Sequence, residues 1–308
     1  MGKSSGAKVV RFEQRLQHRL QAVLEAMPVA VSWASLQDQT IEFVNRKFTE
    51  MFGYVLGDHA TVSQWIESTY INPDQARRTE ETWFPYFQDL SAETMQIPQV
   101  EVDVRCKDGS IRNTLVGGVI LPDVGWALAT FVDISKLKKS EAQLTRLALE
   151  DPLTGLPNRR AFTESMKSSL ARAGRSNASV ALLLVDLDGF KLLNDTLGHD
   201  HGDLVLQTMA QRLRETTRAG DVACRLGGDE FAVIVDGVTD LRVAEQVADR
   251  LINALRRPFT LDGKPTSMSS SVGISIYPLD APTDAALFKH ADLALYRAKN
   301  GGRGRWSR

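Results

Sequence analysis

The spacing of apolar residues predicts a helix near the start of the chain and two short strands after it. Six apolar residues at helical spacing precede Pro28, where we expect the helix to end: Phe12, Leu16, Leu20, Val23, Leu24 and Met27. Apolar runs then predict strands over residues 29–33 and 41–44, joined by a polar turn. Residues 45–54 suit a short helix that ends in a turn.

A hairpin and two further strands complete this first pattern. Val100, Val102 and Val104 alternate with charged residues and lead into Lys107-Asp108-Gly109, whose Asp-Gly pair is typical of a hairpin turn. Strands are also predicted over residues 114–121 and 126–132. The pattern therefore indicates a small α+β domain with an antiparallel sheet over residues 28–134, preceded by a tail and an amphipathic helix over residues 1–27.

From Ile134 the pattern becomes helical, which predicts a linker over residues 135–150. Four apolar residues take a and d positions of two heptads: Ile134, Leu137, Leu144 and Ala148. Glu141 interrupts this seam. Two heptads fit either a coiled coil or a single surface helix between two domains, and both interpretations remain open.

After a break at residues 151–156, helical and strand patterns alternate to the end of the chain. Helices are predicted over residues 158–173, 204–217, 243–255 and 285–299, and strands over residues 179–186 and 268–276. A further hairpin encloses Gly227-Gly228. Such alternation favours helices that cover a central sheet, so residues 151–308 are expected to form a second domain and the whole chain an α+β protein.

The composition narrows the class of protein. The chain has 308 residues, of which 43% are hydrophobic and 24% are charged, and this suits two globular domains. Its net charge of -1 gives no overall positive field that would favour binding of nucleic acid. Cys106 and Cys224 lie far apart, which argues against disulfides or zinc. The longest strongly apolar run covers residues 180–185, which is far shorter than the ~20 residues that a helix needs to cross a bilayer. The first residues lack the apolar core of a signal peptide. We expect a cytoplasmic protein without a membrane span.

The string Arg225-Leu-Gly-Gly-Asp-Glu-Phe231 carries the first candidate chemistry. Two glycines permit a tight reversal, which places Asp229 and Glu230 at its tip. Another acid, Asp186, ends the buried strand, and two facing acids repel unless a cation lies between them. Oxygen ligands of this kind suit a hard cation such as Mg²⁺. An ordinary hairpin and a separate solvated strand end remain the alternative if the two strands are not neighbours.

The first domain resembles a PAS sensor domain. The order of its elements, the Asn45…Phe48…Gly53-Tyr54 pattern, the Lys-Asp-Gly hairpin and the closing Asp133-Ile-Ser135 carry the resemblance. Its ligand is unknown. Cys106 lies beside no flavin-adduct motif, and none of the five histidines is assignable as a haem ligand; His18 and His59 are expected at the surface. The pocket holds a small metabolite, or is collapsed and serves dimer contacts.

The second domain resembles the GGDEF domain of bacterial diguanylate cyclases, from Asp151 to the C-terminus. Four motifs carry the resemblance, at residues 151–160, 186–195, 227–231 and 296–303. The resemblance implies a palm-like sheet of the nucleotidyl-cyclase type, surrounded by helices. It also implies a homodimer that condenses two GTP into cyclic di-GMP and releases two pyrophosphates, regulated by the PAS domain.

The resemblance implies roles for individual residues of the metal site. Asp186, Asp229 and the backbone carbonyl of Leu187 would hold Mg²⁺ or Mn²⁺. Glu230 would contact the metal or the ribose, and either Asp229 or Glu230 would act as the general base.

Other residues are implied to bind the nucleotide. Asn194 and Asp203 would select guanine, because a carboxylate accepts hydrogen bonds from its N1–H and exocyclic amine and would face a lone pair in adenine. The substrate-binding residues Phe190 and Lys191 lie in the same motif as Asn194. Lys191, Lys299 and Arg303 would bind the triphosphate. By itself the basic C-terminal segment suits a solvated helix end, and Gly304 and Trp306 depart from the family pattern with unknown effect.

Arg218-Ala-Gly-Asp221 stands at the spacing of the family's inhibitory RxxD site, where Arg218 and Asp221 would bind the product. A surface ion pair is the ordinary alternative.

A catalytically silent receptor for GTP or cyclic di-GMP is the second hypothesis for the whole chain. The presence of both acids of the hairpin, Asp229 and Glu230, argues against it. A combined synthase and phosphodiesterase is not expected, since nothing follows Arg308.

Overall fold

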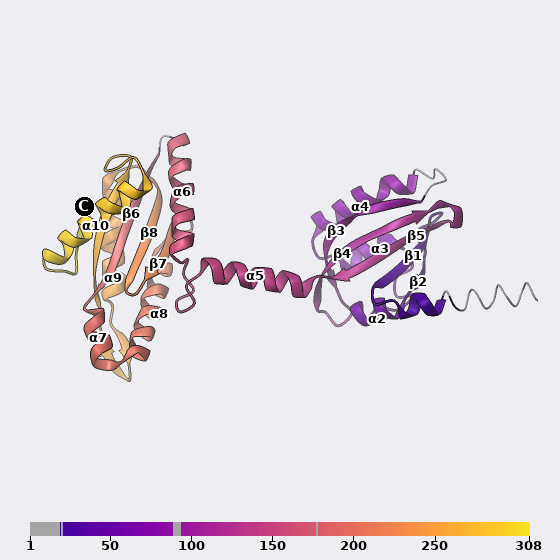
Figure 1. Ribbon diagram of the computed structural model, residues 1–308, viewed down its shortest axis with the longest axis horizontal. Helices are drawn as coiled ribbons and strands as arrows, with labels where there is room; N and C mark the ends of the chain where they lie inside the picture. The colour runs from indigo at the N-terminus through magenta and orange to yellow at the C-terminus, as the bar shows by residue number, and fades with distance from the viewer. Residues whose placement is uncertain (1–18, 20, 89–93, 177) are drawn as a thin grey trace, which may run out of the picture. The chain divides into compact units, whose positions relative to one another are not determined.

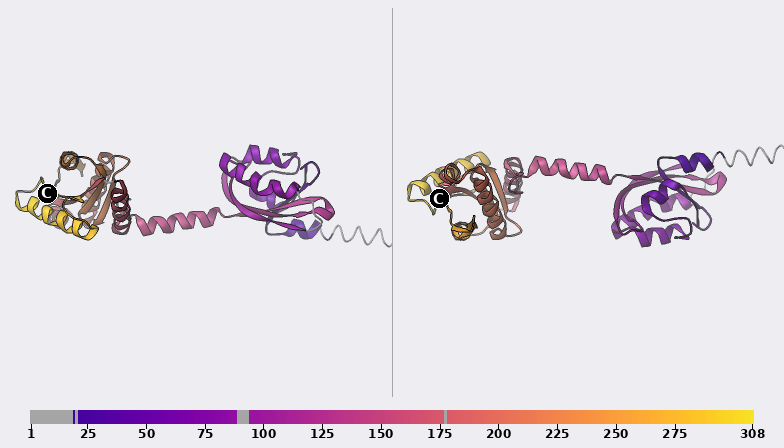
Figure 2. Two further views of the ribbon diagram at one scale, coloured as in Figure 1. Left: turned by 90° about the horizontal axis from the view of Figure 1, so that it is seen from above. Right: turned by 90° about the horizontal axis from the view of Figure 1, so that it is seen from below.

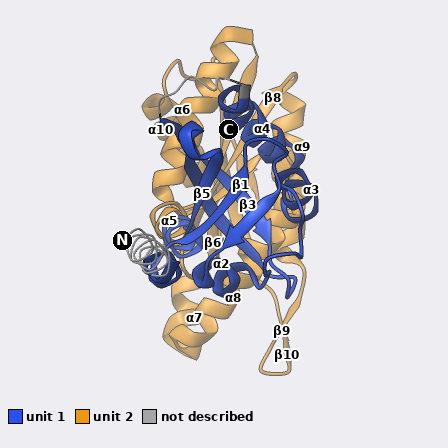
Figure 3. Ribbon diagram, turned by 90° about the vertical axis from the view of Figure 1, so that its right-hand side faces the viewer, with its two compact units in different colours: residues 1–142 blue, residues 143–308 orange. Residues whose placement is uncertain are grey.

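The computed structural model describes residues 19, 21–88, 94–176 and 178–308. The chain forms two compact units, residues Met1–Ala142 and Gln143–Arg308, and each is described by itself (Figure 3). Their boundary falls inside helix α5 (Ser135–Leu149), so the expected four-part division of the chain stays a proposal. None of the helices in the described ranges is both long and apolar enough to cross a bilayer.

The first unit contains a five-stranded antiparallel sheet in the order β2-β1-β5-β4-β3 (Figure 1). Its strands are β1 (Ala30–Ser35), β2 (Ile41–Val44), β3 (Met95–Arg105), β4 (Ile111–Leu121) and β5 (Trp126–Asp133). The expected Asp-Gly turn joins β3 to β4. The ends of β1, β2, β4 and β5 lie within three residues of the predicted ones, whereas β3 begins five residues before Val100, the first residue that the pattern indicated.

Three helices pack against this sheet (Figure 2): α2 (Arg46–Phe52), α3 (Val62–Thr69) and α4 (Pro73–Gln88). Their apolar residues form one core with the strands. The pattern predicted α2 but neither α3 nor α4. Helix α4 was hard to predict because it is rich in charged residues and contains Pro85, which usually interrupts a helix.

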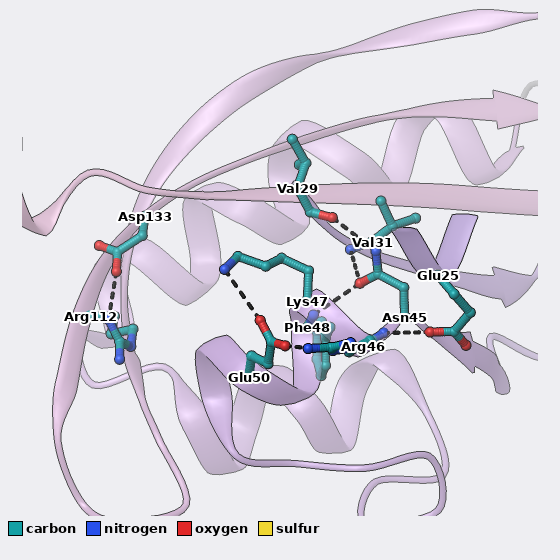
Figure 4. A network of polar contacts seen from close by, with 10 residues as sticks. All are labelled: Glu25, Val29, Val31, Asn45, Arg46, Lys47, Phe48, Glu50, Arg112 and Asp133. Carbon is teal, nitrogen blue, oxygen red and sulfur yellow. Dashed lines mark hydrogen bonds and ion pairs between the residues drawn. The ribbon is translucent and has the colours of Figure 1, made fainter. Parts of the chain in front are cut away.

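Buried Asn45 joins three elements of the first unit (Figure 4). Its Oδ1 accepts hydrogen bonds from the amides of Val31 (3.0 Å) and Phe48 (2.9 Å), the second of which caps α2. Its Nδ2 donates to the carbonyls of Val29 (2.9 Å) and Leu24 (3.0 Å). The preceding helix ends at residue 26, just before Pro28, and the predicted part before residue 19 lies outside the described residues.

The second unit contains a sheet in the order β12-β11-β6-β8-β7, antiparallel except for the β11–β12 pair. Its strands are β6 (Ser179–Asp188), β7 (Val222–Gly227), β8 (Glu230–Val238), β11 (Ser269–Tyr277) and β12 (Trp306–Ser307). A separate hairpin consists of β9 (Phe259–Leu261) and β10 (Lys264–Thr266). Strands β6 and β11 and the β7–β8 hairpin were predicted, whereas β9, β10 and β12 were too short to be recognised.

Helices cover both faces of this sheet. Helices α8 (His199–Thr216) and α9 (Leu241–Arg256) share a core with one set of alternating β6 side chains, including Leu183 and Val185. Helices α6 (Arg159–Ser176) and α10 (Asp284–Asn300) share a second core with the opposite set, including Leu182 and Leu184. A short helix, α7 (Phe190–Leu197), precedes α8, which begins five residues earlier than predicted.

Candidate active site

The acids of the second unit lie together at one edge of its sheet. Strands β6 and β8 pair directly, with Asp186 opposite Glu230, and the Leu187 amide donates to the carbonyl of Asp229 (3.4 Å). Gly227 (φ +144°) and Gly228 (φ +54°) form the turn at positive φ that glycine favours. The acids are on neighbouring strands, so the alternative with separate strand ends does not apply.

The side chain of Asp186 is only 12% exposed and faces a cation. Lys299 in the last turn of α10 brings its Nζ to 2.7 Å from Asp186 Oδ2. Burial raises the pKa of Asp186, the hydrogen bond and charge of Lys299 oppose this rise, and the charges of Asp229 and Asp188 add to it. An acid in this position favours a neighbouring cation, which Lys299 supplies here.

Arg225 holds the turn in place, a role that the sequence did not indicate. Its Nε and Nη2 donate to the carbonyl of Gly228 at 3.1 and 2.8 Å, and its Nη1 lies 2.9 Å from Asp151 Oδ1. Asp151 also accepts from the amide and hydroxyl of Thr154. Burial opposes ionisation of Asp151, but Thr154 and Arg225 outweigh it and lower its pKa. The 151–160 motif therefore positions the turn that carries Asp229.

Asp188 binds the C-terminal segment, which is a second role that the sequence did not indicate. Its carboxylate accepts hydrogen bonds from the hydroxyls of Ser269 and Ser271, both 2.7 Å, and from the amide of Gly304 (3.0 Å). Trp306 donates its indole N–H to Asp249 (2.8 Å) and pairs with β11 as part of β12. The two departures from the family pattern thus lie where the C-terminal segment attaches to the domain.

The candidate guanine-binding residues meet where α7 is followed by α8. Asn194 lies on α7 and the exposed Asp203 on α8. A Cβ on Gly202 would approach Asn194 Oδ1 to 1.8 Å, so a larger residue there would displace the Asn194 side chain from this position. Asn194 Oδ1 is buried and accepts no hydrogen bond from the described residues. A buried acceptor without a donor suits a ligand that brings an N–H group.

The remaining candidates are more scattered. On α7, Phe190 is buried and Lys191 is exposed. Arg303 is exposed as well, and its side chain forms no hydrogen bond or ion pair with the described part of the chain. Arg218 binds Asp221 (3.1 Å) and the carbonyl of Asp236 (2.6 Å). This pair precedes β7, so the length of a six-residue strand, roughly 20 Å, separates it from the Gly-Gly turn.

The donor atoms at the acidic edge fit a divalent metal. Across the described ranges no three His, Cys, Asp or Glu side chains are grouped closely enough to enclose an ion. Mg²⁺, however, commonly binds through one or two carboxylates and completes its coordination with substrate phosphates and water. Asp186, Asp229 and the Leu187 carbonyl are all oxygen donors at this edge, so the residues fit such an ion.

Comparison with known proteins gives two family matches. The profile described as "Diguanylate cyclase, GGDEF domain" matches residues 148–305, about half of the chain. A PAS domain profile matches residues 18–85.

Individual relatives match a little over half of the chain. Diguanylate cyclase TpbB of Pseudomonas aeruginosa is 41% identical over 171 residues, 55% of this chain and 39% of the relative. Cyclic di-GMP phosphodiesterase NbdA of the same species is 39% identical over 170 residues, 55% of this chain and 22% of the relative. A solved structure is also similar: the crystal structure of the coiled coil and GGDEF domain of DgcB from Caulobacter crescentus, in complex with c-di-GMP. It superposes with a TM-score of 0.52 at 28% sequence identity and covers 56% of this chain and 92% of that one. The chain covers well under half the length of the curated relatives.

Proposed function

The chain belongs to the diguanylate cyclase GGDEF-domain family, with a PAS domain ahead of the GGDEF domain, and on this premise we propose that it condenses two GTP into cyclic di-GMP. The observation that carries the proposal is the pairing of β6 with β8, which gathers Asp186, Asp229 and Glu230 at one edge. Asn194 and Asp203, on the helices that follow β6, are suited to guanine. Two relatives named as diguanylate cyclases, 41% and 42% identical, align with 55% and 51% of the chain and support the proposal.

Binding and orientation of the nucleotide follow from the donors and acceptors present. Asp203 and Asn194 Oδ1 would accept from the N1–H and exocyclic amine of guanine. Lys191, Lys299 and Arg303 would neutralise the triphosphate, and this requires Lys299 to leave Asp186 for phosphate. Fixed cations of this kind stabilise the negative charge that develops during phosphoryl transfer.

Asp186, Asp229 and the Leu187 carbonyl would hold Mg²⁺ or Mn²⁺. When bound, this ion would neutralise phosphate charge and lower the pKa of the attacking 3′-hydroxyl. In each of two equivalent steps, a 3′-oxygen forms a bond to the α-phosphorus of the other GTP, and the bond from that phosphorus to pyrophosphate breaks. The hydroxyl proton passes to a carboxylate of the turn, Asp229 or Glu230. Each domain carries residues for one GTP, so the proposal includes a homodimer.

Regulation is part of the proposal. Arg218 and Asp221 would bind cyclic di-GMP, since a guanidinium suits phosphate and a carboxylate suits the guanine edge. Both residues would first have to release each other, because Arg218 Nε lies 3.1 Å from Asp221 Oδ1. We assign control of the activity to the PAS domain on the basis of the family architecture.

The test is a chromatographic assay of the purified full chain with GTP and Mg²⁺ or Mn²⁺. Cyclic di-GMP and pyrophosphate should form in a 1:2 ratio, ATP should give no cyclic product, and Asp229→Ala should abolish turnover. Asp292→Asn, an exposed acid on α10, is the matched control and should match wild type. Absence of product from a dimeric sample that still binds GTP would support a silent receptor instead.

A further inference from the structure

Arg159 is the first residue of α6 and lies at the acidic edge of the second unit. A positive charge is unfavourable at the start of a helix, because the unpaired amides there already carry partial positive charge. The first turn of α6 nevertheless contains two arginines, Arg159 and Arg160, and no acid. Residues that depart from a local preference in this way commonly serve a site, so the contacts of both arginines are informative.

The two arginines have different partners. Arg160 pairs with Glu164, one turn further along its own helix (3.1 Å). Arg159 instead contacts the β7–β8 hairpin: its Nε donates to the Leu226 carbonyl (3.1 Å), and its Nη2 lies 3.6 Å from Glu230 Oε2. The side chains of Arg159 and Glu230 are both more than half exposed, so their pair adds little to stability. What the pair does is fix the direction of the Glu230 carboxylate.

Glu230 needs such a partner because another acid faces it. In the β6–β8 pair it lies directly opposite Asp186, and like charges in this position repel. Lys299 neutralises Asp186 (2.7 Å), but it leaves for phosphate in the mechanism proposed above. Arg159 then remains with Glu230 and holds its carboxylate toward α6 rather than toward Asp186.

The preceding residue, Asn158, fixes the start of α6 to the end of α5. Its Oδ1 accepts hydrogen bonds from two amides in the first turn of α6, at 3.0 and 3.1 Å, and so caps this helix. Its Nδ2 donates to the carbonyls of Ala148 (2.9 Å) and Glu150 (3.3 Å). A displacement of the last turn of α5 would therefore be passed to Arg159 through its neighbour in the chain.

We propose that Arg159 is a positioning residue for Glu230, and that Asn158 makes the position of Arg159 depend on the last turn of α5. The guanidinium holds the Glu230 carboxylate beside the proposed metal site but apart from the ion, which is left to Asp186 and Asp229. Since the direction of Glu230 affects turnover only if this edge is catalytic, the assignment rests on the function proposed above.

Steady-state kinetics of the full chain with GTP test the effect on turnover. Arg159→Ala should lower kcat about tenfold, because misplacement of a reacting group by about 1 Å costs up to about 100-fold. The KM for GTP should change by less than about threefold, since the contact with Glu230 is not a contact with the nucleotide. Arg159→Lys keeps the charge without the guanidinium fork and should recover part of kcat. Arg160→Ala is the matched control and should equal wild type; the same kcat in Arg159→Ala would overturn the proposal.

A titration with Mn²⁺ alone, followed by electron paramagnetic resonance, gives a readout that needs no turnover. Without Arg159 the Glu230 carboxylate is free to turn toward the ion, so Arg159→Ala should bind Mn²⁺ about fivefold more tightly than wild type. Arg160→Ala removes the same charge from the same helical turn and should change nothing. The gain should disappear in Arg159→Ala/Glu230→Gln. If Arg159→Ala binds Mn²⁺ no more tightly than wild type, Arg159 does not hold Glu230 and the proposal is wrong. A wild type that forms no cyclic product would refute the proposed function, whereas this titration would still decide the role of Arg159.

Asn158→Ser tests the connection to α5. Serine can still cap α6, but its hydroxyl is too short to reach the carbonyls of Ala148 and Glu150. This variant should lower kcat and tighten Mn²⁺ binding in the same direction as Arg159→Ala, by about twofold to threefold. Combined with Arg159→Ala it should add nothing, because both changes act through Glu230. Wild-type values for Asn158→Ser would overturn the dependence on α5.

Discussion

The contact of Arg225 with the Gly-Gly turn gives a prediction whose magnitude follows from the structure. Replacement by alanine removes two hydrogen bonds to the Gly228 carbonyl and an ion pair with Asp151, at 2.8 to 3.1 Å. The side chains of Arg225 and Asp151 are only 11% and 18% exposed. Loss of one partner of a well-buried pair costs about 3–5 kcal/mol, so we expect about 3 kcal/mol for this nearly buried one.

Hydrogen exchange of the full chain measures this cost locally. Amides of β7 and β8 in Arg225→Ala should exchange on the order of 100-fold faster than in wild type, because 1.4 kcal/mol corresponds to tenfold. Arg159→Ala is the matched control. Arg159 donates to the Leu226 carbonyl (3.1 Å) of the same hairpin, but its side chain is 61% exposed. Its loss should cost about 0.5 kcal/mol.

A double-mutant cycle with Asp151→Asn separates the ion pair from general disruption. We expect a coupling free energy of about 1–2 kcal/mol between Asp151 and Arg225. Arg225→Lys keeps the charge but cannot donate two bonds to one carbonyl from a planar fork, so it should recover only part of the stability. The reasoning is wrong if Arg225→Ala exchanges no faster than Arg159→Ala, or if the cycle gives no coupling.

Three further predictions address charge and pH. Asp186→Asn should abolish cyclic di-GMP formation. In metal-free buffer at pH 8 it should also raise the free energy of unfolding by roughly 0.5–1 kcal/mol, because burial disfavours the charged form of Asp186. Clear destabilisation of this variant in calorimetry would contradict the prediction. His201 contacts the Leu197 carbonyl and Asp262 through its two ring nitrogens, and Asp262 raises its pKa. Attachment of the β9–β10 hairpin should therefore be complete below about pH 6.5, the unfolded pKa, and weaken as pH rises through the raised folded pKa. Hydrogen exchange of residues 259–266 checks this, and Asp262→Asn should remove the pH dependence. Arg218→Ala should retain initial turnover and lose inhibition by added cyclic di-GMP; unchanged inhibition would remove the RxxD proposal.

Most strands of the two five-stranded sheets and most helices could be predicted, because burial on one or both faces gives the apolar residues a regular spacing in the sequence. Leu182 to Leu184 form part of a continuous apolar run since β6 is covered on both faces, and the Asp-Gly turn marks the β3–β4 hairpin locally. Helix α4 lacked such a signal because Pro85 and its charged residues hid the apolar face.

The contacts that build the candidate site were less accessible to prediction. Motif positions placed the acids on the right strands, but the pairing of β6 with β8 depends on tertiary structure. Arg225 and Asp151 are 74 residues apart, and Asp188 and Gly304 are 116 residues apart. No local pattern encodes such pairs. The unpaired Asn194 Oδ1 also becomes visible only when Gly202 is packed beside it.

The C-terminal segment is structurally part of the acidic edge rather than a solvated helix end. Asp186 and Asp188 are two residues apart on β6, so their carboxylates share a face, and the charge of Asp188 adds to the rise in the pKa of Asp186. The segment meets them differently: Lys299 offers Asp186 a cation, while the Gly304 amide joins two serine hydroxyls in satisfying Asp188 with neutral donors. Asp188 therefore has its hydrogen bonds within the protein, whereas Asp186 is paired with one partly exposed cation, Lys299, which leaves Asp186 in the mechanism that we propose. For this reason our proposal assigns the metal to Asp186 and not to Asp188.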